Sequence, residues 1–177
     1  MSAPSLFDDD FDLSVSSAPA SPPVRTGDVD DERYADAGKA LDTLRPYLSR
    51  QQWLALRDCM RGEEKEYFAD KAIELAAVIE NMPVTYAQDG KGADEVKVCL
   101  HYFLGDCHWF ITEKDVEDGV SQAFGFAILH GDMICAELGY ISISELVETG
   151  VEAEMDFYFA PVSLAQMRKQ MEARYGS

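Results

Sequence analysis

Residues 96–111 read VKVCLHYFLGDCHWFI, and this stretch decides the fold class. Apolar side chains recur at every second position, which is the period of a β-strand with one buried face. Gly105-Asp106 interrupts the alternation and is typical of a two-residue hairpin turn. The stretch therefore predicts two antiparallel strands. The face expected toward the core carries Val96, Val98, Leu100, Tyr102, Leu104, Cys107, Trp109 and Ile111. The opposite face carries Lys97, Cys99, His101, Phe103, His108, Phe110 and Thr112.

The segments on either side complete an α+β pattern. Residues 122–129 and 134–141 predict a second hairpin, residues 151–159 a further strand, and the sequence after Pro161 a closing helix. Upstream, residues 31–82 show three helical patterns, and Pro83 ends the last of them. Because the hairpins are tight and need no long crossovers, we expect an α+β fold. Its N-terminal helices pack with an antiparallel sheet of about five strands and a C-terminal helix.

Three segments follow from composition. Residues 1–30 are acidic and rich in Ser, Ala and Pro, which predicts a disordered tail. Residues 31–82 form a three-helix segment, and residues 83–177 form the sheet domain, which is expected to make one compact unit with those helices. Apolar residues alternate with aspartates over residues 6–13 (LFDDDFDL). This pattern suits either a segment that docks on a partner or one that rests on the domain.

Charge and length exclude several classes of protein. The chain has 177 residues and a formal net charge of −18, which excludes a generally basic nucleic-acid binder. It shows no export signal and no apolar run that could span a bilayer, so we expect a cytoplasmic protein whose four cysteines are reduced thiols. A folded part of this size needs no metal or disulfide for stability, and no cofactor is predicted.

Several stretches resemble one known family. They are residues 109–113 (WFITE), 122–125 (QAFG), 136–142 (AELGYIS), and 156–159 (DFYF), with Met82-Pro83, Tyr86 and residues 88–92 (QDGKG) upstream. Together they resemble the domain-of-unknown-function family 2958 over about residues 82–170. The resemblance implies a setting, the accessory cargo of plasmids, phages and integrative elements. It implies no activity for any residue.

The acidity of the sheet region suggests a function. From residue 106 to residue 154 the sequence holds eleven acidic residues and one basic residue, Lys114. Such a surface repels nucleic acid and attracts a basic groove. We therefore predict a non-catalytic accessory protein that binds a host or element protein through an acidic, DNA-mimicking surface, as an anti-restriction or anti-CRISPR inhibitor would. Trp109 and Tyr140 are expected to hold the sheet. The residues predicted to bind the partner are Glu113, Asp115, Glu117, Asp118, Glu137, Glu148, Glu152 and Glu154.

Two alternatives remain open. Cys99, His101 and His108 share the predicted outer face of the first hairpin, and Glu137 is expected beside the histidines. These four side chains could form a small catalytic or zinc site.

The second alternative is a DNA-binding regulator. Arg45, Arg50, Arg57 and Arg61 lie on two short helical segments that could imitate a helix-turn-helix. These arginines could equally pair with Glu63, Glu64, Glu66 or the tail.

Overall fold

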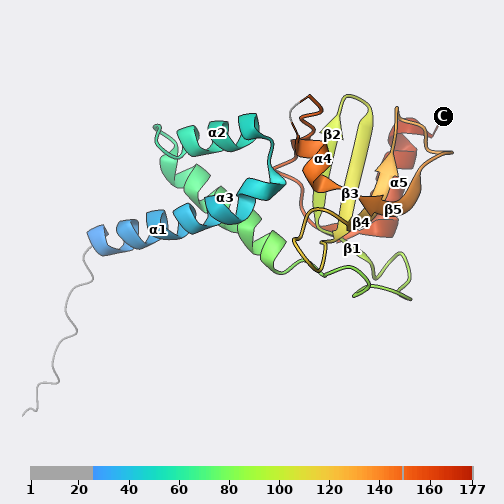
Figure 1. Cartoon of the computed structure of the whole chain (residues 1–177), viewed down its shortest axis with the longest axis horizontal. Coiled ribbons are helices and arrows are strands. Elements are labelled where there is room, and N and C mark those ends of the chain that lie inside the picture. Colours follow the sequence, from blue (N-terminus) through green and yellow to red (C-terminus); the bar gives the residue numbers. More distant parts are fainter. Residues whose placement is uncertain (1–25, 149, 177) are drawn as a thin grey trace, which may run out of the picture.

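A five-stranded antiparallel sheet separates two hydrophobic cores. Figure 1 shows how the helices are arranged around this sheet. The computed structural model describes residues 26–148 and 150–176. The N-terminal helices lie at one end of the molecule, and the C-terminal helix lies on the far side of the sheet. This arrangement confirms the predicted α+β class. Within the described part of the chain, no helix is both long and apolar enough to cross a membrane.

The N-terminal helices are α1 (Thr26–Leu44), a 3₁₀ turn (Arg45–Tyr47), α2 (Arg50–Cys59) and α3 (Lys65–Glu80). The Ser49 side chain accepts a hydrogen bond from the Gln52 N–H and caps α2, as the sequence predicts. Helix α1 begins at Thr26, inside the segment predicted to be disordered. Because acidic residues are in general favourable near a helix N-terminus, an acidic composition does not exclude a helix. The rest of the predicted tail, residues 1–25, lies outside the described residues.

The sheet has the strand order β5-β4-β3-β2-β6. Its strands are β2 (Leu100–Leu104), β3 (Cys107–Glu113), β4 (Ala123–Ile128), β5 (Glu137–Ile141) and β6 (Glu154–Met155). Gly105 has a φ of +58°, which a glycine adopts without strain, and the predicted turn joins β2 to β3. The antiparallel pairing of both predicted hairpins is confirmed, although β5 begins at Glu137 instead of residue 134. The strand predicted over residues 151–159 is reduced to the two residues of β6.

The sheet is buried on both faces, whereas the sequence predicted one core face. Leu100, Tyr102 and Ile111 pack toward the N-terminal helices and α4 (Ile143–Val147). Phe110 lies on the other face, beneath α5 (Leu164–Tyr175), and so does Val98. Val98 changes face because it belongs to a separate short strand. That strand, β1 (Lys97–Val98), pairs with β7 (Val162–Ser163) at the start of α5.

One side chain links the helices to the sheet edge. The Gln52 side-chain amide of α2 donates to the Met155 carbonyl at 2.8 Å and accepts from the Met155 N–H at 2.9 Å. Both backbone groups of this β6 residue are thereby satisfied, as a neighbouring strand would satisfy them. The two hydrogen bonds fix α2 against the edge strand.

Candidate functional site

Three acids of the predicted surface lie on the loop between β3 and β4. Asp115, Glu117 and Asp118 all belong to this loop. The Asp118 carboxylate accepts hydrogen bonds from the Ser121 hydroxyl and from the backbone N–H groups of Val120 and Ser121. These donors favour the charged form and lower the pKa of Asp118 to about 2. The loop therefore carries a negative charge throughout the physiological pH range.

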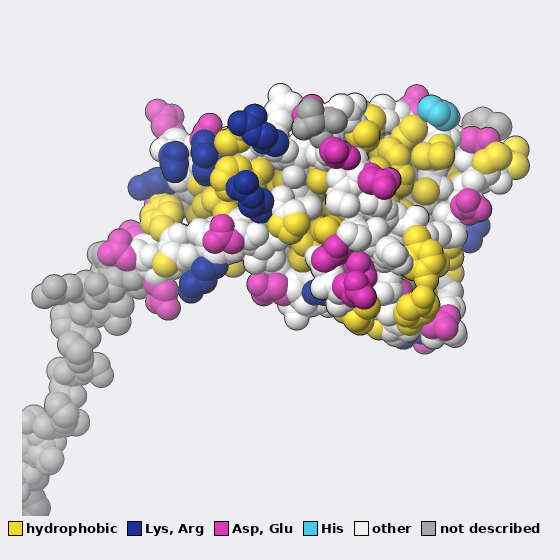
Figure 2. Space-filling model, viewed as in Figure 1, with side chains coloured by type: hydrophobic (Ala, Val, Ile, Leu, Met, Phe, Trp, Pro, Cys, Tyr) yellow, Lys and Arg dark blue, Asp and Glu magenta, His cyan; other side chains and the backbone are white. Residues whose placement is uncertain are grey.

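The other exposed acids follow α4 or lie on the edge strands. Glu148 follows α4, and Glu152 lies just before β6. Glu154 is the first residue of β6, and Glu137 is the first residue of β5. Figure 2 shows acidic side chains spread over the sheet part of one face, while Lys and Arg gather over the helical part. Ion pairs among the described residues involve other carboxylates. None of these ion pairs includes the predicted partner-binding acids Asp115, Glu117, Asp118, Glu137, Glu148, Glu152 and Glu154.

Two of the predicted surface acids need correction. Glu113 is only 5% exposed, because β3 extends to this residue and the 85–91 loop folds over it. Its carboxylate accepts hydrogen bonds from the backbone N–H groups of Tyr86 at 2.9 Å and Gln88 at 2.6 Å. Glu137 is exposed but lies on the sheet face opposite the histidines. Through the pairing of β5 with β4 and of β4 with β3, Glu137 lies in the same cross-strand row as Trp109. Residues of one row share a face of the sheet, and His108, the neighbour of Trp109, lies on the other face.

The predicted catalytic set does not assemble. Cys99 is buried in the core toward the N-terminal helices, Glu137 is exposed on the face opposite the histidines, and only His101 and His108 meet. Among the described residues, no group of three or more His, Cys, Asp or Glu side chains could hold a metal ion.

The two histidines form part of a hydrogen-bond relay beneath α5. His101 contacts Asp156 at 3.3 Å and His108 at 2.9 Å, and His108 contacts the Tyr175 hydroxyl at 2.9 Å. The Tyr175 hydroxyl also lies 3.4 Å from Asp106. Two neutral imidazoles satisfy the contacts from Asp156 to Tyr175 when each donates toward Asp156 and the single Tyr175 hydroxyl proton is donated to His108 rather than to Asp106.

Burial keeps the two histidines of this relay neutral. It lowers the pKa of His108 to about 4, with further lowering from the neighbouring His101 and Arg174. Burial also lowers the pKa of His101, although Asp156 opposes the shift. The relay joins the sheet to the end of α5, and its contacts are those of a structural network inside a core.

The arginines of the helical part lie on and around α2. Arg57 pairs with Asp58 at 3.0 Å, whereas the predicted partner Glu66 pairs with Arg33 of α1. Arg45, Arg50 and Arg61 take part in no ion pair among the described residues.

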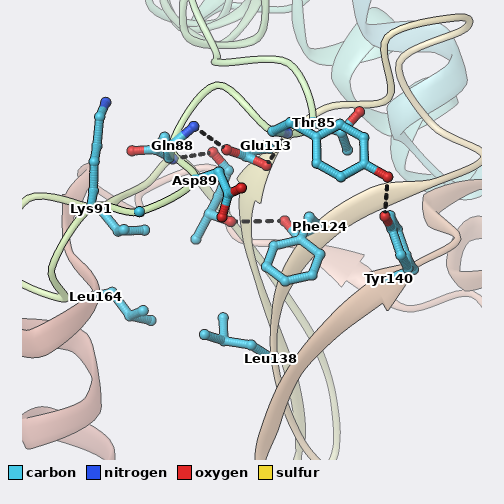
Figure 3. Close-up of a pocket in the computed structure, with 13 residues that line it drawn as sticks. Thr85, Gln88, Asp89, Lys91, Glu113, Phe124, Leu138, Tyr140 and Leu164 are labelled. Carbon is cyan, nitrogen blue, oxygen red and sulfur yellow. Dashed lines mark hydrogen bonds between the residues drawn. The ribbon is translucent and has the colours of Figure 1, made fainter.

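A pocket of about 340 Å³ lies on the α5 side of the sheet, and sequence reasoning did not find it. Phe124 of β4, Leu138 of β5 and Leu164 of α5 face the same open space (Figure 3). Tyr140 was expected to hold the sheet, but this residue is 57% exposed. Its hydroxyl lies 2.6 Å from that of Tyr86 at the rim. The pocket therefore has apolar walls and a polar rim.

Buried hydrogen bonds hold the loop of residues 85–91, which lines one side of this pocket. The Gln88 side-chain amide donates to the Thr112 and Lys97 carbonyls and accepts from the Lys97 N–H. Glu113 adds its two contacts to the same loop. Tyr86 has a φ of +75°, a conformation that costs energy for a bulky residue and clusters at functional sites. The hydrogen bonds of Gln88 and Glu113 thus hold the loop in a strained backbone conformation.

Comparison with known proteins gives one match. A family model described as "Protein of unknown function (DUF2958)" matches residues 72–172, which is more than half of the chain. The chain belongs to this family. Searches of curated proteins and of solved structures gave no match.

The DUF2958 region contains every residue of the pocket. The matched residues begin within α3 and include the sheet, the acidic loop and most of α5. Several stretches that carry the resemblance also line the pocket, including Tyr86, Glu113, Phe124 and Tyr140. The arginines of α2 lie outside the DUF2958 region. The pocket is therefore a feature of the family domain in this chain, and the arginine surface belongs to the preceding helices.

Proposed function

We propose that this chain is a non-catalytic accessory protein of a mobile genetic element that works in the cytoplasm. It binds a host or element protein that has a basic, nucleic-acid-binding surface. The acidic loop, the residues after α4 and the residues at β6 contact that surface. In this way the chain occupies a site that would otherwise hold DNA, as an anti-restriction or anti-CRISPR inhibitor does.

The observation that carries this proposal is that three acids share the loop between β3 and β4 and that, like Glu148 and Glu154, they form no ion pair within the described residues. A carboxylate that already has an intramolecular cation gains little from a second one. Asp115, Glu117 and Asp118 lie on one exposed or partly exposed loop, and Glu148 and Glu154 are exposed. Charges on such a surface attract a basic partner over about 8–10 Å at physiological salt and guide its approach.

A charge-reversal experiment tests the proposal. The immobilised full chain is exposed to lysate of a host bacterium, and a 20-base-pair DNA duplex elutes the retained proteins. If DNA elutes a captured protein, that protein binds the immobilised chain through its DNA-binding surface. The triple variant E117K/E148K/E154K should retain at least tenfold less of these proteins, because like charges across an interface oppose association.

A matched variant controls for net charge. Asp42, Glu63 and Glu64 are exposed acids of the helical part and form no ion pair among the described residues. The variant D42K/E63K/E64K changes the net charge equally and should retain the captured proteins. Equal retention by both triple variants would reject the acidic surface as the binding site.

A second candidate function rests on the pocket. In this function the pocket binds an apolar or aromatic group of a ligand, because apolar walls with a few polar groups at the rim are typical of ligand sites. The supporting observation is that residues carrying the family resemblance surround the pocket beside the strained Tyr86.

The fluorescent probe 8-anilinonaphthalene-1-sulfonate should bind the folded chain, and Leu138→Asp should abolish its signal. Ile134→Asp is the control, since Ile134 is 97% exposed and lies outside the pocket lining. Equal signals from both variants would exclude the pocket.

A further inference from the structure

Two arginines stack on one tryptophan of α2. The guanidinium carbons of Arg45 and Arg57 lie 5.0 Å and 5.3 Å from the centre of the Trp53 ring, within the range of a cation–π contact. The indole N–H of Trp53 donates to the Leu41 carbonyl of α1 at 3.1 Å. The ring is thus fixed between the end of α1 and the guanidinium groups.

A shallow hollow of about 360 Å³ adjoins this ring. It is lined by Arg45, Leu48, Arg50, Trp53 and Leu54. Arg45 and Arg50 are exposed, and neither forms an ion pair among the described residues. Figure 2 shows the basic side chains gathered over this end of the molecule. The surface offers positive charge beside an aromatic ring, which suits a ligand that is both anionic and aromatic. We call this set of five residues the Arg–Trp surface.

We propose that residues 7–12 of the same chain bind the Arg–Trp surface. These residues read FDDDFD and combine four carboxylates with two phenyl rings. The aspartates would form charge-assisted hydrogen bonds with Arg45 and Arg50. The phenyl rings of Phe7 and Phe11 would enter the hollow beside Trp53. This contact is independent of the partner-binding surface proposed above, which lies on the sheet part.

The length of the chain allows this contact. Leu41, which holds the Trp53 ring, lies fifteen residues after Thr26 on α1, or about 22 Å along the helix axis. The connection from Asp12 to Thr26 can span up to about 46 Å when extended. A tethered segment of this length meets its site at an effective concentration in the millimolar range. Even a weak contact would therefore be populated.

Charge favours this segment over a nucleic acid. Affinity for nucleic acid depends on the number of phosphates neutralised, and the Arg–Trp surface offers two arginines without a carboxylate partner. The rest of the chain carries a large negative charge that opposes a polyanion of any length. A short acidic segment of the same chain, held nearby by the connection, avoids much of this repulsion.

The indole N–H signals of Trp53 and Trp109 in the NMR spectrum of the full chain test the proposal. Trp53→Phe assigns the Trp53 signal. The variant D8N/D9N/D10N/D12N should shift the Trp53 signal and leave the Trp109 signal in place. In the wild type, 1 M salt should produce the same shift, because it shortens the screening length to about 3 Å.

Matched controls separate the segment from other occupants. Neutralising four exposed acids elsewhere (D31N/E32Q/D42N/E63Q) should leave the Trp53 signal unchanged, and so should tenfold dilution of the wild type. A shift that disappears on dilution would assign the surface to a second copy and overturn the proposal. An unchanged Trp53 signal in the tail variant would also overturn it. A twelve-nucleotide single strand that moves the signal equally in wild type and tail variant would assign the surface to nucleic acid instead.

Discussion

Acidification should weaken the fold through the relay beneath α5. His108 is 3% exposed and lies between His101 and Tyr175. Its pKa is about 4 in the folded chain, against an ordinary value of about 6.5 in the unfolded chain. Between these two values the unfolded chain binds a proton that the folded chain does not. Stability is therefore complete above about pH 6.5 and falls as the pH decreases toward 4.

The magnitude follows from the two pKa values. Between pH 8 and pH 5, the His108 difference alone removes about 2 kcal/mol from the free energy of unfolding. The lowered pKa of His101 acts in the same direction. The lowered pKa values of Asp118 and Asp132 act only near pH 4 and below, since both carboxylates ordinarily titrate there. Measurements above pH 5 thus isolate the histidines.

Urea unfolding at several pH values between 5 and 8 measures this loss. His108→Phe removes the titrating group and should reduce the pH dependence by about 2 kcal/mol, whatever its effect at pH 8. His130→Asn is the control, because His130 is exposed and lies outside the relay. An asparagine also tolerates the φ of +56° at this position. Equal pH dependence in the wild type and His108→Phe would refute the argument.

Three other changes should alter stability. Glu113→Ala leaves two backbone N–H groups of the 86–88 loop without a partner, so we expect a loss of about 2–6 kcal/mol and faster amide hydrogen exchange in that loop. In Gly125→Ala the new methyl group would collide with the Phe110 backbone carbonyl, and calorimetry should show a clearly lower melting temperature. Ser163→Ala removes the N-cap of α5, which should cost about 1 kcal/mol in urea unfolding.

Local patterns predicted the first hairpin and the strand pairing of the second, but not the short length of β6. The alternation over residues 96–111 and the Gly105-Asp106 turn gave the first hairpin, because both signals arise within a few residues. The assignment of faces failed at Val98, since the alternation continues through Cys99 while the backbone leaves one ladder and joins another. A sequence pattern of period two does not record such a change of partner strand.

The candidate site was harder to predict because its contacts are distant in sequence. Glu113 looked like one more surface acid, and its donors are backbone groups more than twenty residues upstream. Tyr140 has the alternation of a core residue, yet β5 is the outermost strand and its side chains are mostly exposed. Neither the type nor the spacing of Glu113 and Tyr140 indicates that the first is buried and the second exposed. The acidity of the 115–118 loop was visible at once, because composition alone determines it.

The capping of Met155 by Gln52 has a consequence for self-association. A sheet grows by adding strands at its edges, and an exposed edge is a template for another chain. Here the β6 edge is occupied at Met155 by a side-chain amide, whereas β5 is the terminal strand at the other edge. Two copies whose five-stranded sheets joined edge to edge through β5 would leave the two β6 edges at the ends of the combined sheet, and each of these is occupied at Met155. Strand pairing between copies would close at a dimer and would not propagate into a fibre.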